Sequence, residues 1–164
     1  MRETARRDYA SSRKRVRELL DKTHDGVSRY TYTTHPVPSH YSPRLNEIAI
    51  TSRNIDQPGV FLHEYGHYVN FRVHGGVTEE GSAFRRAFAS DVRRLTGNGR
   101  RAGERRGRIR ALLDEVGYRG DPSTSDLFAA VTDNRIRGDY AHPDWYFAAE
   151  GRREVEAFEQ TLNQ

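Results

Sequence analysis

The chain has 164 residues, with 27 lysines and arginines against 23 aspartates and glutamates, 35% hydrophobic residues and no cysteine. This length suffices for one domain with its own core, and the lack of cysteine excludes disulfides and thiolate metal sites. Residues 1–20 are charged throughout and no apolar run could span a bilayer. We therefore expect a single domain over residues 1–164, without a signal peptide or membrane segment, in the cytoplasm.

The hydrophobic pattern, taken in chain order, predicts an α+β fold with a small antiparallel sheet before a run of helices. An amphipathic helix at 3–22 ends before Gly26, and strands follow at 29–34 and 46–51. The remaining expected elements are helices at 56–74, 78–95, 104–116, 123–132 and 152–162, a glycine- and arginine-rich loop at 97–103, and an irregular aromatic loop at 135–147.

His63-Glu64-Tyr65-Gly66-His67 forms an H-E-x-x-H motif inside the expected helix 56–74. Residues four apart share one face of a helix, so His63 and His67 can direct ring nitrogens to one zinc ion. Glu64 would lie beside the metal without binding it, where it can take a proton from water and pass it to a leaving amine. The motif thus predicts a metallopeptidase with one Zn²⁺ per chain.

A chance match is the alternative interpretation of so short a motif, and the flanks of the motif favour the zinc site. Asp56 is a plausible N-cap and Pro58 suits the first helical turn. Gly75-Gly76 then provides a helix end. These signals favour a buried helix with the motif in its middle.

A catalytic zinc needs a third protein ligand. The longer metzincin pattern would require glycine at 70 and histidine at 73, but the chain has Asn70 and Val73, and His74 is one residue out of register. A carboxylate from a later helix is therefore expected. Glu156 is favoured because apolar residues bracket it in the last helix. The other candidates are Glu159, which helical geometry does not exclude, Glu154, Asp91, Glu80 and Glu115.

The strand at 46–51 directly precedes the motif helix. An edge strand in this position can pair with an extended peptide substrate, in which case Ile48 and Ile50 would bind substrate. An ordinary sheet strand is the alternative.

Five stretches of sequence, which together span about residues 40–160, resemble those of a known family. They are Tyr41-Ser42-Pro43 with Asn46-Glu47-Ile48, His63 to Val69, Asp126 to Thr132, Gly138 to His142, and Glu154 to Phe158. With them the chain resembles small gluzincin-type metallopeptidase domains related to the anthrax lethal factor catalytic domain. It is especially similar to those of phage head-morphogenesis (minor capsid) proteins and bacterial polymorphic toxins.

The resemblance implies a minimal zincin-like fold, with Glu156 as zinc ligand in an E-A-F-like segment. It also implies a tyrosine of the aromatic loop, Tyr146 or Tyr140, that hydrogen-bonds the oxyanion. Pro143 stands where the family often has glycine, and the final helix is shorter than usual, so both tyrosines remain candidates. A phage-encoded member would act in the virion or the host cell.

His142 belongs to the same aromatic loop. It is a candidate to bind substrate or to donate a hydrogen bond to a carboxylate of the zinc site. A loop histidine that satisfies backbone groups is the alternative.

These features predict a zinc-dependent endopeptidase that acts on a protein or peptide, in phage- or toxin-associated processing, on generic or on one dedicated substrate. The alternative is a non-catalytic, zinc-stabilised module of a phage head or toxin assembly. Such a module would bind nucleic acid through the arginine clusters at 6–17 and 100–110. We favour solvated helix faces for these clusters, because acidic residues interleave with them. Oligomeric state stays open.

Overall fold

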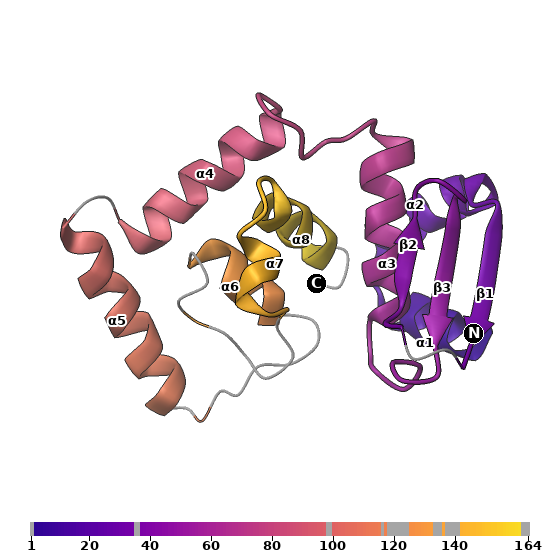
Figure 1. Cartoon of the computed structure of the whole chain (residues 1–164), viewed down its shortest axis with the longest axis horizontal. Coiled ribbons are helices and arrows are strands. Elements are labelled where there is room, and N and C mark those ends of the chain that lie inside the picture. The colour runs from indigo at the N-terminus through magenta and orange to yellow at the C-terminus, as the bar shows by residue number, and fades with distance from the viewer. Residues whose placement is uncertain are drawn as a thin grey trace. The chain divides into compact units, whose positions relative to one another are not determined.

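The computed structural model describes residues 2–34, 37–97, 100–115, 117, 125–132, 136 and 142–161. The chain divides into two compact units, Met1–Gly76 with Phe158–Gln164, and Val77–Ala157 (Figure 1). Helices and a small sheet make up the described structure, which confirms the expected α+β class. Within the described part of the chain, no helix has both the length and the apolar character needed to cross a bilayer.

The sheet of the first unit has three strands in the order β1-β3-β2. β1 (Arg29–Thr33) runs parallel to β3 (Glu47–Thr51), and β2 (His40–Ser42) runs antiparallel to it. The expectation of a purely antiparallel sheet is therefore wrong for the β1–β3 pair. The expected edge strand is also wrong, because β2, a strand that the sequence pattern did not predict, covers the second side of β3.

The N-terminal segment forms two helices, α1 (Arg2–Ser11) and α2 (Lys14–Thr23), where the sequence predicted one. The backbone of Arg13 is extended, with φ −67° and ψ 154°. The hydroxyl of Ser12 donates to the carbonyl oxygen of Tyr9 at 2.8 Å, a local bond that competes with the helical ladder. The Tyr9 hydroxyl then donates to the Asp21 carboxylate at 3.0 Å and ties the two helices together.

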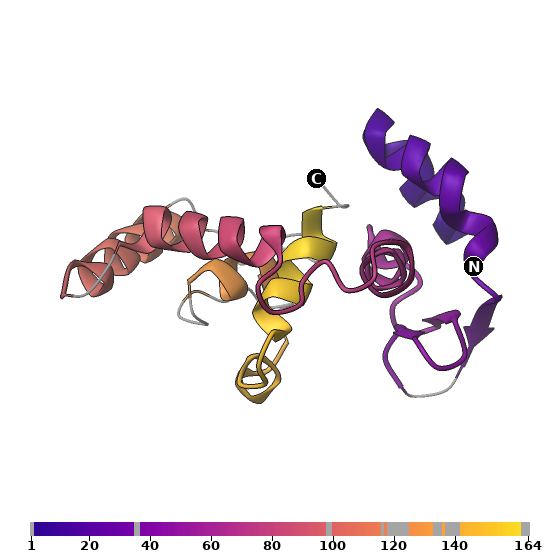
Figure 2. The same ribbon diagram turned by 90° about the horizontal axis from the view of Figure 1, so that it is seen from above.

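The motif helix α3 spans Val60–Tyr68 and packs against α1, β2 and β3; Figure 2 looks down its axis. Seven of its nine residues are buried, and Ile48 and Ile50 of β3 belong to the same core. A π-helical turn, η2 (Val69–Val73), continues it. Gly75 and Gly76 follow with φ 63° and 83°, which confirms the predicted end because this left-handed backbone favours glycine.

The start of α3 differs from the prediction, because neither Asp56 nor Pro58 begins it. Gly59, with φ 78°, is the residue before the helix. The carboxylate of Asp8, on α1, accepts hydrogen bonds from the backbone N–H of Gly59 at 3.1 Å and of Phe61 at 3.0 Å. Asp8 is buried, so a side chain about fifty residues away caps the motif helix.

The regular elements of the second unit that the structure describes are helices. They are α4 (Ala83–Thr96), α5 (Arg100–Glu115), α6 (Ser125–Val131), α7 (Asp144–Phe147) and most of α8 (Arg152–Gln160). The Ser82 hydroxyl accepts from the N–H of Arg85, so α4 begins later than the predicted 78. A small core forms around Ala129, Ala130, Phe147 and Ala157. α8 is one continuous helix, and its last residues belong to the first unit.

Candidate metal centre

His63 and His67 lie one turn apart on α3, as the motif predicted. Their ring centroids are 5.1 Å apart and the ring planes are inclined by 83°. Both side chains are partly exposed, whereas Glu64 and Tyr65 between them are buried. The two histidines thus form the accessible face of an otherwise buried helix.

α8 passes close to the backbone of α3 at Gly66. A Cβ atom added at Gly66 would lie 2.9 Å from both the Cα and the Cβ of Glu159, closer than real side chains pack. The backbone of α8 could not keep this position against any larger residue. The glycine inside the motif therefore brings the end of α8 to the two histidines.

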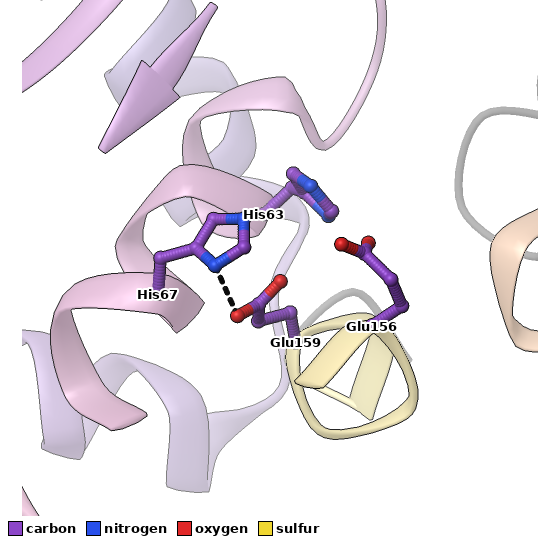
Figure 3. A group of neighbouring side chains, drawn as sticks. All are labelled: His63, His67, Glu156 and Glu159. Atoms are coloured by element: carbon purple, nitrogen blue, oxygen red, sulfur yellow. Dashed lines mark ion pairs between the residues drawn. The ribbon is translucent and has the colours of Figure 1, made fainter. Parts of the chain in front are cut away.

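Two buried side chains of α8 contact the Nδ1 atoms of the motif histidines. The Glu159 carboxylate pairs with Nδ1 of His67, drawn as a dashed line in Figure 3. The amide nitrogen of Gln160 lies 3.4 Å from Nδ1 of His63, and a rotated amide would present its oxygen to the same atom. Metal-binding histidines are usually oriented by such a partner on the other ring nitrogen. These contacts are suited to direct Nε2 of each ring toward a metal.

Glu156 lies one helical turn before Glu159 on α8, on the same face. His63, His67, Glu156 and Glu159 each offer a donor atom, and these atoms lie within 4.8 Å of one another (Figure 3). Donors on one tetrahedral zinc lie roughly 3.3 Å apart, given bonds of about 2.0–2.1 Å. Small side-chain shifts would close this set. Two imidazoles with carboxylates, and no thiolate, fit a catalytic zinc ion.

Tyr146, one of the two predicted tyrosines, contacts the predicted ligand Glu156. Its hydroxyl donates to Oε1 of Glu156 at 2.5 Å. It also accepts a hydrogen bond from the Arg152 guanidinium at 3.3 Å. Tyr140 lies outside the described residues. A role for Tyr146 at the oxyanion remains a prediction.

His142 contacts the carboxylate of Asp126, which the sequence pattern did not indicate as a site residue. Its backbone N–H donates to Asp126 Oδ1 at 2.7 Å, and its Nδ1 lies 2.6 Å from Oδ2. Asp126 and Gln160 were both missed. Their spacing to the residues they contact, sixteen positions for Asp126 and nearly a hundred for Gln160, follows no local period. Substrate binding by His142 remains a prediction.

The structure does not support a substrate contact for Ile48 and Ile50. Both side chains are completely buried in the core beneath α3, and their strand is paired on both sides. The prediction for these two residues was wrong, because the local pattern did not reveal β2.

The other candidate zinc ligands are either paired with an arginine or exposed. Glu154 pairs with Arg85 at 3.4 Å and Asp91 with Arg94 at 3.2 Å. Glu80 and Glu115 are exposed. Of the carboxylates that the sequence offered as zinc ligands, the structure therefore favours Glu156 and Glu159 of α8.

Two tyrosines anchor the motif helix to the end of α2. Burial raises the pKa of Tyr65 to about 12, and its hydroxyl lies 2.5 Å from that of Thr23. Burial also raises the pKa of Tyr68, which donates to the Thr23 carbonyl at 2.9 Å. Both phenols therefore stay neutral and hold α3 in place from the side opposite to solvent.

Comparison of the chain with known protein families, with curated proteins and with solved structures finds no match. The functional assignment therefore depends on the residues of α3 and α8 themselves.

Proposed function

We propose that this protein is a zinc-dependent endopeptidase, with His63, His67 and Glu156 as zinc ligands and Glu64 as general base. The observation that carries the proposal is the approach of buried α8 carboxylates to both motif histidines. Two histidines and one glutamate, with a fourth position left for water or substrate, are the ligand pattern of catalytic zinc.

The two carboxylates of α8 take different roles in this proposal. Glu159 contacts Nδ1 of His67, the position of an orienting partner for a ring that binds metal through Nε2. Glu156 is the segment's E-A-F glutamate and lies one turn away. Glu159 therefore orients, and Glu156 binds. An exchange of these roles would leave the same donor set.

When bound, zinc supplies Lewis-acid polarisation of the scissile carbonyl and lowers the pKa of water. Glu64 takes the proton from the attacking water and delivers it to the leaving nitrogen. Its burial in α3 limits exchange of that proton with bulk solvent. The Tyr146 hydroxyl donates its one proton to Glu156 before substrate binds, and it would turn that proton toward the oxygen that becomes negatively charged.

The experiment combines elemental mass spectrometry with proteolysis of denatured casein and of a peptide library, with and without a chelator. We expect about one zinc per wild-type chain and chelator-sensitive cleavage. Zinc should be lost or loosened in Glu156→Gln more than in Glu159→Gln. The reverse order would exchange the two roles. A wild-type chain that binds no zinc after reconstitution would remove the proposal.

A second candidate function is a non-catalytic, zinc-stabilised module that binds nucleic acid. Arg101, Arg105 and Arg108 on α5 line, with Glu104, a hollow of about 370 Å³. An intact Glu64 favours the peptidase, because a structural zinc needs no base and usually has four protein ligands. DNA affinity that falls steeply with salt, without any cleavage of protein, would favour the module.

A further inference from the structure

A buried aspartate and a partly exposed histidine form a pair in the second unit, outside the H-E-x-x-H motif. Asp126 of α6 is 5% exposed, and each of its two carboxylate oxygens accepts from the same residue. Oδ1 accepts the backbone N–H of His142 at 2.7 Å, and Oδ2 lies 2.6 Å from Nδ1 of the ring. This double contact places a proton on Nδ1 and fixes the plane of the imidazole.

The fixed imidazole is stacked on the ring of Tyr146. The two ring centroids are 4.1 Å apart and the planes differ by 17°. The Arg152 guanidinium carbon lies 5.0 Å from the same tyrosine centroid. Phe147 meets both rings edge-on, at 6.3 Å from His142 and 5.5 Å from Tyr146. The tyrosine ring therefore cannot tilt without losing these contacts.

The contacts that start at Asp126 lead through His142 and Tyr146 to Glu156, the predicted zinc ligand. The Tyr146 hydroxyl donates to Oε1 of Glu156 at 2.5 Å, and Glu156 is completely buried. A glutamate side chain has several rotamers, and an outer hydrogen-bond donor selects the one that presents the carboxylate to a metal.

We propose that Asp126 and His142 are positioning residues, which hold the Tyr146 hydroxyl against Glu156 and thereby set the zinc affinity of the site. The proposal rests on the proposed function, because Glu156 must be a zinc ligand. It deepens that function by assigning the control of metal affinity to a pair of residues outside the motif.

A second metal site is the competing explanation of these residues. Asp126, His142 and Glu156 also offer donor atoms within 4.8 Å of one another. However, the 2.6 Å between Nδ1 and Oδ2 is a hydrogen-bond distance, whereas two donors on one tetrahedral metal lie roughly 3.3 Å apart. Oε1 of Glu156 also already accepts from Tyr146. The geometry favours a proton between Asp126 and His142.

The test measures zinc affinity by competition with a chromophoric chelator, on wild type, His142→Phe, Tyr146→Phe and the double variant. Each single variant should bind zinc about 10–100-fold more weakly, as expected for the loss of an outer-shell partner. The double variant should bind no more weakly than the weaker single one, because both act through the same hydroxyl. Visible absorption of the cobalt-substituted proteins should show the same altered coordination in all three.

Asp126→Asn should weaken zinc binding as the His142 and Tyr146 variants do. Asp25→Asn is its matched control. Asp25 pairs with His24 at 3.1 Å on the exposed turn after α2, so its replacement should leave zinc affinity unchanged. If Asp126→Asn fails to fold, His142→Phe still tests the proposal, because the His142 side chain is 36% exposed and its replacement keeps a ring in place.

The results would distinguish a failure of the positioning role from a failure of the proposed zinc peptidase. Wild-type zinc affinity that is unchanged in His142→Phe and Tyr146→Phe would overturn the inference and leave the peptidase proposal standing. Two zinc ions per wild-type chain, with one lost in Asp126→Asn, would also overturn it, in favour of a second metal site. A wild-type chain without zinc would overturn the proposed function itself.

Discussion

Helices α3 and α5 differ in what surrounds them. Seven of the nine α3 residues are buried, whereas among the described side chains of the sixteen-residue α5 only that of Ala102 is buried. Asp8 caps α3 from α1, core residues surround α3, and α8 packs closely against it at Gly66. α5 carries local pairs such as Arg110–Asp114 at 3.1 Å. A substitution in α3 should therefore disturb tertiary contacts, whereas the same substitution in α5 should not.

The largest contrast is expected between two glutamate-to-glutamine changes, Glu64→Gln on α3 and its control Glu104→Gln on α5. Loss of a general base should lower the rate of peptide hydrolysis by about 10²–10⁴-fold, with zinc content unchanged because Glu64 is not a ligand. Glu104 is exposed, so its replacement should leave the rate unaltered. Casein hydrolysis measured beside zinc content tests both. Full activity in Glu64→Gln would contradict the mechanism.

The next effect comes from adding one methyl group to each helix. Gly66→Ala places a Cβ 2.9 Å from the backbone of Glu159, and the overpacking should cost about 1–3 kcal/mol of unfolding free energy and loosen zinc. In contrast, nothing lies within 4 Å of the corresponding atom at Gly107.

Gly107→Ala on α5 should therefore stabilise the protein by about 0.5–1 kcal/mol, since alanine is the better helix former. Urea unfolding of both variants measures the contrast. If both glycines tolerated alanine equally, α8 would not pack on α3 as described.

A smaller effect is expected from removing a single carboxylate. Asp8→Ala deletes the acceptor of two backbone N–H groups at the start of α3 and should cost about 0.5–2 kcal/mol. Asp114→Ala removes a pair on α5 whose side chains are about half exposed, worth about 0.3–0.5 kcal/mol. Thermal unfolding monitored by circular dichroism compares the two. Equal shifts would argue against the remote cap.

The last effect is absent at neutral pH and appears only at high pH. Burial raises the pKa of Tyr65 from 10.0 to about 12, so the folded state binds this proton more tightly than the unfolded chain does. The resulting stability is fully present below pH 10 and is lost as the pH rises toward 12. The unfolding midpoint should fall over this range in wild type and less in Tyr65→Phe. Tyr32→Phe, at a half-exposed position on β1, should behave as wild type.

Local patterns predicted much of the fold. Alternation at 29–34 and 46–51 predicted β1 and β3. Periodicity predicted a helix in the place of each of α3, α4, α5, α6 and α8, with ends that differ from the observed ones by up to six residues, at the end of α3. The pattern failed at Ser12, where a side-chain hydrogen bond interrupts the helix, and at the three-residue strand β2. Such short features carry too few residues to show a period.

In the candidate site, too, local spacing was predictable from the sequence and long-range contacts were not. The motif alone predicts that His63 and His67 share a helical face with Glu64 beside them, because that spacing depends only on the pitch of α3. Three further features come from the packing of distant segments: Asp8 caps this helix, Gly66 leaves room for α8, and Glu159 and Gln160 contact the two ring nitrogens. Those contacts join residues about fifty to a hundred positions apart, and hydrophobic packing, which has no residue period, brings them together.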